Sequence, residues 1–72
     1  MGERVYGFHA IEEALKKAGM GSTIYLQRNG GERIQSLERQ AQLTGKVAVK
    51  KVSKEELERM MPGVDLRGAL LD

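Results

Sequence analysis

Tyr6, Gly7 and His9 stand where a short strand, expected over residues 4–6, turns into a helix expected over residues 8–18. The first turn of a helix presents unpaired backbone N–H groups and the positive end of the helix dipole, so it readily receives a phosphate. His9 would lie beside such an anion, and the Tyr6 ring could stack on an unpaired base. The alternatives are a local hydrogen bond for His9 and core packing for Tyr6.

A set of arginines lies at predicted strand ends and loops: Arg4, Arg28, Arg33 and Arg67. The guanidinium group matches phosphate geometry, and α/β folds bind their ligands in loops at the carboxyl ends of strands. If these arginines gather on one rim of the sheet, they form an anion-binding face. The lysines that flank the third predicted strand favour a solvated, edge-protecting role instead: Lys46, Lys50, Lys51 and Lys54.

Several kinds of chemistry are missing from the sequence. It has no cysteine and one histidine, which excludes thiolate zinc sites, cysteine nucleophiles and multi-histidine metal sites. It has no phosphate-binding loop of the nucleotide-hydrolase or dinucleotide type. The carboxylate pairs Glu12-Glu13 and Glu55-Glu56 lie in first turns of helices, where the helix dipole favours them. We therefore expect a chain that binds no metal and is not itself catalytic.

Hydrophobic periodicity predicts strands over 4–6, 23–27, 47–49 and 68–71, with helices over 8–18, 32–43 and about 54–60 between them. Gly19 is expected to end the first helix. Ser53 and Glu56 form a capping-box pattern, with Val52 and Leu57 as its hydrophobic staple. The order β-α-β-α-β-α-β predicts a three-layer α/β/α sandwich around a largely parallel sheet, in which the third strand would be buried on both faces if it were central.

The length of 72 residues indicates a single domain, residues 1–72, with a thin core. No apolar run approaches the roughly 20 residues that span a bilayer, and the N-terminus lacks the apolar stretch of a signal peptide. We expect a soluble, cytoplasmic protein with no membrane partner. The net charge of +2 is a weak electrostatic signal, so any nucleic-acid binding would depend on where the charges lie.

The chain resembles the N-terminal substrate-binding domain of SpoU/TrmH-type RNA ribose 2′-O-methyltransferases. The opening pattern is carried by Val5, Tyr6, Gly7, His9, Ala10, Ile11, Glu13, Ala14 and Leu15. Later parts of the resemblance are the strand Thr23-Ile24-Tyr25-Leu26, the helix opening Glu32-Arg33-Ile34, and a segment with Val52, Ser53, Glu55, Glu56, Leu57 and Met60.

This resemblance implies a domain that recognises ribosomal RNA, with a fold similar to ribosomal kink-turn-binding proteins. S-adenosylmethionine would be bound by a linked methyltransferase domain that has no counterpart in these 72 residues, in a parent enzyme that could pair as a homodimer. Together with the arginines at strand ends and loops, this makes the predicted RNA-binding residues Arg4, Tyr6, Gly7, His9, Arg28, Arg33 and Arg67.

One segment departs from the family pattern. The family typically has histidine, glutamine and glycine before the last strand, and the corresponding residues here are Leu66, Arg67 and Gly68. If the replaced pair contacts RNA in the family, this chain either reads its target differently or uses Arg67 as a phosphate contact. Gly68 marks a close approach of the backbone. Two alternative functions remain: a protein-interaction or dimerisation module with an exposed apolar patch of Met60, Met61 and Leu66, and a free-standing ribosomal-type RNA-binding protein.

Overall fold

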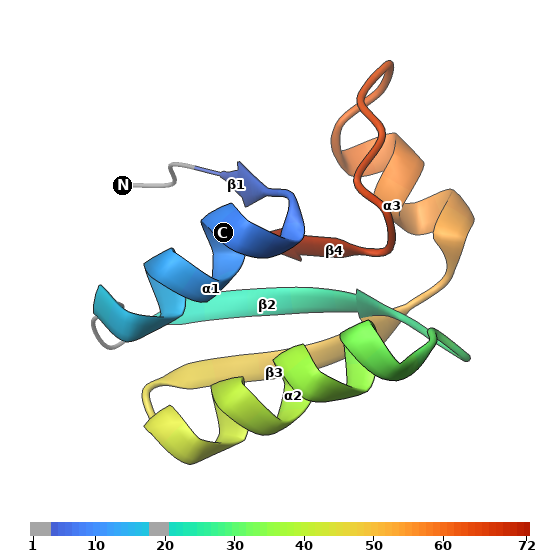
Figure 1. The fold of residues 1–72 in the computed structure, drawn as a ribbon. Coiled ribbons are helices and arrows are strands. Elements are labelled where there is room, and N and C mark those ends of the chain that lie inside the picture. The colour runs from blue at the N-terminus through green and yellow to red at the C-terminus, as the bar shows by residue number, and fades with distance from the viewer. Residues whose placement is uncertain (1–3, 18–20) are drawn as a thin grey trace.

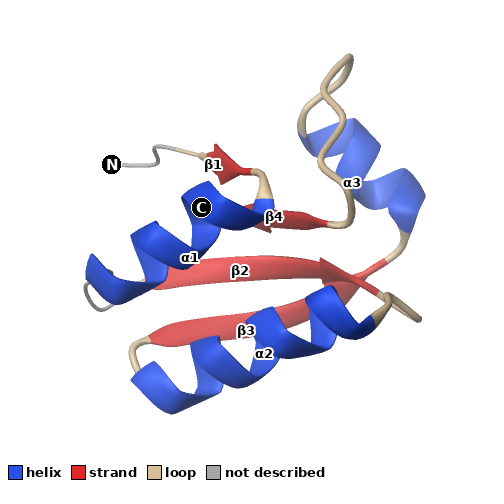
Figure 2. Cartoon of the chain, viewed as in Figure 1, coloured by secondary structure: helices blue, strands red, loops and turns tan. Residues whose placement is uncertain are grey.

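The computed structural model describes residues 4–17 and 21–72 (Figures 1 and 2). In chain order the elements are β1 (Val5–Tyr6), α1 (Phe8–Lys17), β2 (Ser22–Gln27), α2 (Glu32–Thr44), β3 (Val47–Val52), α3 (Lys54–Met60) and β4 (Ala69–Leu71). The predicted β-α-β-α-β-α-β order is confirmed. The predicted end of the first helix at Gly19 lies outside the described residues.

The sheet has the strand order β1-β4-β2-β3 and is mixed, so the expectation of a largely parallel sheet is wrong. Only β2 and β3 pair in parallel, whereas β4 runs antiparallel to both β1 and β2. The reason is the length of α3. A seven-residue helix advances about 10 Å, whereas the six-residue β2 extends over about 20 Å. The helix alone is therefore too short to return the chain to the start of the sheet, and the loop of residues 61–68 leads into β4 beside the end of β2.

The third strand lies at an edge of the sheet, which corrects the idea of a central, doubly buried strand. It is also longer than predicted and continues through Lys50 and Lys51, both exposed, to the buried Val52. Charged residues at an edge discourage pairing with another chain. The predicted edge-protecting role fits this position of the lysines.

The layers follow from the alternation of side chains along the central strands. Ile24 and Leu26 of β2 face α1 and α2, where they pack with Ile11, Leu15, Ile34 and Leu37. Tyr25 faces the opposite side and packs against a second cluster on α3, made of Val52, Leu57, Leu66 and Leu70. Helices thus cover both faces of the sheet, and the predicted three-layer α/β/α sandwich is confirmed.

The predicted boundary at Ser53 is confirmed for the Ser53 cap and the hydrophobic staple, and among the described residues no return bond from the Glu56 side chain to the Ser53 amide is seen. Its hydroxyl accepts a hydrogen bond from the backbone N–H of Glu56 at 3.1 Å. Val52 and Leu57 lie in the same buried cluster, as a hydrophobic staple requires. This cap starts α3 directly after β3 and so fixes where the chain leaves the sheet.

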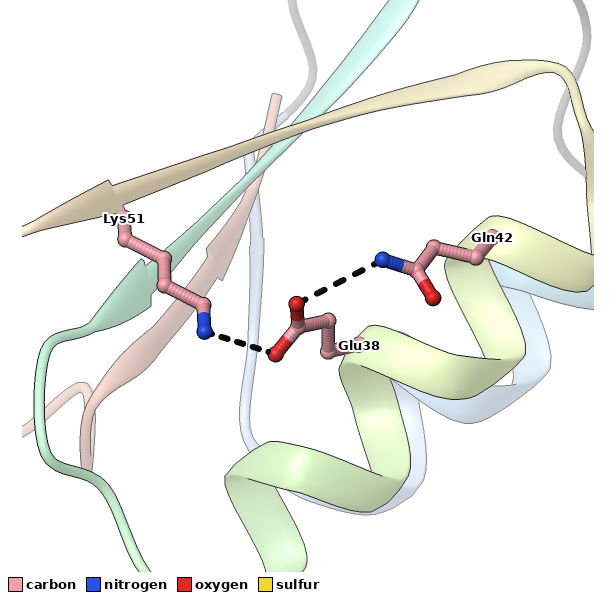
Figure 3. A network of polar contacts seen from close by, with 3 residues as sticks. All are labelled: Glu38, Gln42 and Lys51. Carbon is pink, nitrogen blue, oxygen red and sulfur yellow. Dashed lines mark hydrogen bonds and ion pairs between the residues drawn. The ribbon is translucent and has the colours of Figure 1, made fainter.

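A polar network ties α2 to the edge strand (Figure 3). Lys51 Nζ lies 3.0 Å from Glu38 Oε1, and the amide of Gln42 donates to Glu38 Oε2 at 3.4 Å. The Glu38 side chain is only 23% exposed, which reduces screening by water compared with an open surface pair. Lys51 therefore has a structural partner.

The helices α1, α2 and α3 all begin at the same end of the sheet, on the right of Figure 1. Because β4 is antiparallel, its first residues lie at that end too. Leu26 pairs with Ala69, and the backbone N–H of Gln27 donates to the Gly68 carbonyl at 2.8 Å. We call this end, residues 6–9, 27–33, 53–54 and 65–68, the rim.

No helix among the described residues is long and apolar enough to cross a membrane. In the same residues no group of three or more histidine, cysteine, aspartate or glutamate side chains lies close enough together to hold a metal ion.

Candidate functional site

The turn from β1 into α1 forms one side of the site. Gly7 has φ +88°, a conformation that glycine adopts without a steric penalty, and its carbonyl accepts the N–H of Ile11 at 3.0 Å. The sharp bend leaves Tyr6 47% exposed, so core packing, the alternative role for this ring, is wrong. His9 is exposed, and among the described residues its imidazole has no hydrogen-bond or ion-pair partner.

The rim carries a shallow concavity of about 410 Å³, which we call the rim concavity. Its lining comes from the β1–α1 turn, the first turn of α2 and the loop before β4. Most of the residues predicted to bind RNA line it: Tyr6, Gly7, His9, Arg33 and Arg67. Phe8, Ala10 and Asp65 complete the lining.

Arg33 is placed by the first turn of α2 and by an aromatic ring. Its guanidinium carbon lies 5.0 Å from the centroid of the Phe8 ring, within the range of a cation–π contact. Phe8 in turn packs against the core cluster beneath α1 and α2. The stacking orients the guanidinium group before any ligand arrives while the residue stays exposed.

Arg67 is held by Asp65. The Oδ1 atom of Asp65 accepts the backbone N–H of Arg67 at 3.2 Å, and Oδ2 lies 3.7 Å from the guanidinium Nε. Arg67 has φ +55°, which is uncommon for a residue with a side chain. The bond to Asp65 closes a local turn that supports this conformation and directs the chain into β4.

Gly68 follows in the same conformation, with φ +88°. A Cβ at this position would lie 3.1 Å from Gln27 Oε1 and 3.2 Å from Ile34 Cδ1. The predicted close approach of the backbone at Gly68 is therefore confirmed, and it brings the loop before β4 down onto the end of β2.

Arg4 and Arg28 do not line the rim concavity. The Arg4 guanidinium donates from Nη1 to the carbonyl of Met60 at 2.6 Å, where the last turn of α3 leaves carbonyl groups unpaired. Arg28 pairs through its backbone, donating to the Val52 carbonyl at 2.8 Å, and its side chain is exposed. Their predicted contact with RNA stays a prediction, and the structure assigns Arg4 a role in holding α3.

A second concavity, of about 510 Å³, lies on the α3 side of Asp65 and Arg67, and we call it the α3 pocket. Its lining is Gln27, Lys54, Leu57, Glu58, Val64, Asp65, Leu66, Arg67 and Gly68. Sequence reasoning missed this pocket and the role of Asp65. The available signal was the spacing Asp65-Leu66-Arg67-Gly68, in which an acceptor side chain stands three residues before a turn glycine.

The chemistry of the rim is that of a polyanion site. Two guanidinium groups, an imidazole and a phenol surround a hollow that contains one carboxylate, Asp65, already engaged with Arg67. Arginine binds phosphate through paired N–H groups, and an exposed aromatic ring can stack on a base. These side chains come from three separate segments of the sequence and are gathered by the fold.

A family model described as RNA 2′-O ribose methyltransferase substrate binding matches residues 4–65. The chain belongs to this family. No curated protein matches the sequence. The resemblance inferred from the sequence is thus confirmed, and this RNA-substrate-binding domain carries its cationic hollow on the elements that the family model covers, apart from Arg67.

The matched residues of the substrate-binding family end at Asp65, so the correspondence proposed for Leu66, Arg67 and Gly68 stays a prediction. The structure does correct the apolar patch on which the protein-interaction alternative depended. Leu66 is only 5% exposed, and Met60 and Met61 pack against the buried cluster of α3. Leu66 belongs to the core, and Met60 and Met61 are half-buried against it, so the exposed apolar patch expected from these three residues does not form.

Proposed function

We propose that this domain recognises ribosomal RNA for an S-adenosylmethionine-dependent ribose 2′-O-methyltransferase in the cytoplasm. Membership of the RNA-substrate-binding family makes RNA the partner of the domain. In this proposal a linked methyltransferase domain binds S-adenosylmethionine and transfers the methyl group, in a parent enzyme that pairs as a homodimer. The domain described here holds the RNA.

The observation that carries the proposal is the convergence of Tyr6, His9, Arg33 and Arg67 on one hollow at the rim. RNA helices are recognised mainly by shape, through phosphate and 2′-hydroxyl contacts, and unpaired bases by stacking on aromatic rings. Arg33 and Arg67 supply the phosphate contacts, and Tyr6 supplies an exposed ring at the edge of the same hollow.

The test is a titration of a fluorescent, structured ribosomal RNA fragment with the protein, followed by anisotropy at several salt concentrations. Affinity should fall as salt rises from about 50 to about 200 mM. Binding of the protein releases counterions from the RNA, and a higher salt concentration opposes that release. Arg33→Ala and Arg67→Ala should each weaken binding and make the salt dependence less steep by about 0.7 to 0.9 in log–log slope.

Lys50→Ala is the matched control, because it removes one exposed cation from the edge strand without touching the rim concavity. The slope of log affinity against log salt concentration should be the same for Lys50→Ala as for the unaltered protein. Absence of binding at high micromolar protein would overturn the proposal. Equal losses of RNA affinity in the arginine variants and in Lys50→Ala would also overturn it.

A further inference from the structure

The α3 pocket has the size of a ligand site. Its volume of about 510 Å³ falls within the range of about 300 to 1,000 Å³ that is usual for small-ligand pockets. It opens between the first turn of α3, the end of β2 and the loop before β4. Nothing in the rim contacts described above uses most of its lining.

The floor of this pocket is apolar and firmly packed. Leu57 is 2% and Leu66 is 5% exposed, and both belong to the buried cluster between α3 and the sheet. Val64 packs on the same cluster from the loop and remains partly exposed. A flat, weakly hydrated group could lie against these side chains without any rearrangement of the fold.

The mouth of the pocket has hydrogen-bonding groups of both kinds. Lys54 donates, Glu58 accepts, and the Gln27 amide does both. The Gln27 amide has no hydrogen-bond partner among the described residues, and its oxygen faces Gly68. Mixed donors and acceptors of this type match the edge of a nucleobase. The two carboxylates of the lining, Glu58 and Asp65, balance its two cations, Lys54 and Arg67, so the pocket suits an uncharged base better than a phosphate.

The α3 pocket and the rim concavity share Asp65 and Arg67. An RNA strand whose phosphate is bound by Arg67 at the rim would therefore pass the mouth of the pocket. The guanidinium plane of an arginine is itself a surface on which unstacked bases are known to lie. Continuity with the proposed RNA face thus identifies the occupant as part of the same strand.

We propose that the α3 pocket receives one unpaired nucleobase of the RNA whose backbone lies in the rim concavity. This inference rests on the proposed function and adds to it a preference for one kind of RNA structure. The domain would select RNA that contains an extruded or looped-out nucleotide over an uninterrupted duplex, because only an unstacked base can enter the pocket.

The experiment fills the pocket with Val64→Phe and measures binding to two RNAs with equal numbers of phosphates. One is a helix with an unpaired nucleotide and the other is fully paired. The unaltered protein should prefer the first. Val64→Phe should weaken binding of the first RNA at least about fivefold, the low end of the contribution of one stacked base, and change the second by less than about twofold.

Leu43→Phe is the matched control, since it adds the same ring at a side chain that is 85% exposed and outside both concavities. Circular dichroism and thermal unfolding check that each variant folds. If Val64→Phe fails to fold, Gln27→Ala removes the amide at the pocket mouth and should reduce the same preference. A 2-aminopurine at the unpaired position should change its fluorescence on binding, and this change should be lost in the pocket variant.

The possible results separate the inference from the proposed function. Equal binding of both RNAs by the unaltered protein would overturn the base pocket while the RNA-binding function stands. If Val64→Phe bound the RNA with the unpaired nucleotide as tightly as the unaltered protein does, and kept the 2-aminopurine fluorescence change on binding, the base pocket would be overturned in the same way. Absence of any RNA binding would overturn both.

Discussion

The pair Asp65 and Arg67 carries much of the site at the scale of single residues. Arg67 adopts a left-handed backbone conformation, φ +55°, that costs an ordinary residue roughly 1 kcal/mol. The hydrogen bond from its N–H to Asp65 Oδ1 helps to offset this cost. Asp65 therefore positions an arginine in a hollow where its own negative charge opposes the binding of RNA.

These two effects of Asp65 can be separated by substitution. Asp65→Asn keeps an oxygen acceptor for the Arg67 N–H and removes the charge, whereas Asp65→Ala removes both. Asp65→Asn should bind structured RNA at least as tightly as the unaltered protein. Asp65→Ala should bind about threefold or more weakly than Asp65→Asn, because it loses one hydrogen bond that orders Arg67.

The two variants are compared by anisotropy titration at one salt concentration. If Asp65→Ala bound RNA as tightly as Asp65→Asn, Asp65 would have no positioning role. The unaltered Arg67 in both variants keeps the number of cations equal, so a difference in affinity reports the placement of Arg67.

The residue types of the site were predictable from the sequence. Which of the predicted arginines would line the rim concavity was not. Tyr6, Gly7 and His9 belong to one short segment, so their proximity follows from the strand, the bend and the helix. Arg67 joins them only because β4 is antiparallel, which no local pattern indicates. Arg4 precedes β1 and instead reaches Met60 across the fold, a contact between residues 56 positions apart.

At the scale of elements, the rim exists because α1, α2 and α3 begin at one end of the sheet and β4 starts there as well. The loop between β2 and α2 must then pass close to the helix that it enters. A Cβ on Gly30 would lie 2.6 Å from the Cβ of Ile34, whereas a Cβ on Gly31 would meet nothing within 4 Å. Gly30 is therefore required because the loop approaches Ile34 closely.

Substitutions at these neighbouring glycines should have opposite effects on stability. Gly30→Ala forces Ile34 away and should lower the free energy of unfolding by about 1 to 3 kcal/mol, as overpacking does. Gly31→Ser should raise it by a few tenths of a kcal/mol, because Gly31 is the N-cap of α2 and has an extended backbone but no capping side chain. Urea unfolding of both variants measures the difference.

Gly30 and Gly31 are neighbours in the same short loop, so the unfolding free energies of the two variants can be compared directly. A Gly30→Ala protein as stable as the unaltered chain would show that Ile34 can move without cost. A destabilised Gly31→Ser protein would contradict the assigned N-cap.

Element boundaries with local chemistry were predictable, and strand direction was not. The start of α3 is marked by the hydroxyl of Ser53, which caps the N–H of Glu56, and by the apolar pair Val52 and Leu57. The helix accordingly begins at Lys54. The edge position of β3 and the reversal of β4 depend on how far a short helix and its following loop carry the chain. Such distances are set by tertiary packing and leave no periodic signal in the sequence.

At the scale of the whole molecule, two small cores lie on either face of one sheet and meet at its central strands. Leu70 belongs to the cluster on α3, and its neighbours Ala69 and Leu71 belong to the cluster under α1 and α2. Arg67 and Gly68 lie between Leu66 in one core and Ala69 in the other, and Asp65 directly precedes Leu66. The site is therefore supported from both sides of the sheet, and a shallow surface hollow keeps a defined shape in a domain of 72 residues.

The central claim is that RNA binds at the rim concavity. Its most direct test is a two-dimensional ¹H–¹⁵N NMR titration of the labelled protein with a structured ribosomal RNA fragment. If RNA binds there, backbone signals of residues 6–9, 33 and 65–68 should shift or broaden, while those of Leu43 and Lys46 to Lys50, on the far end of α2 and the edge strand, should change little. Perturbations gathered on that lysine edge, with the rim unaffected, would contradict it.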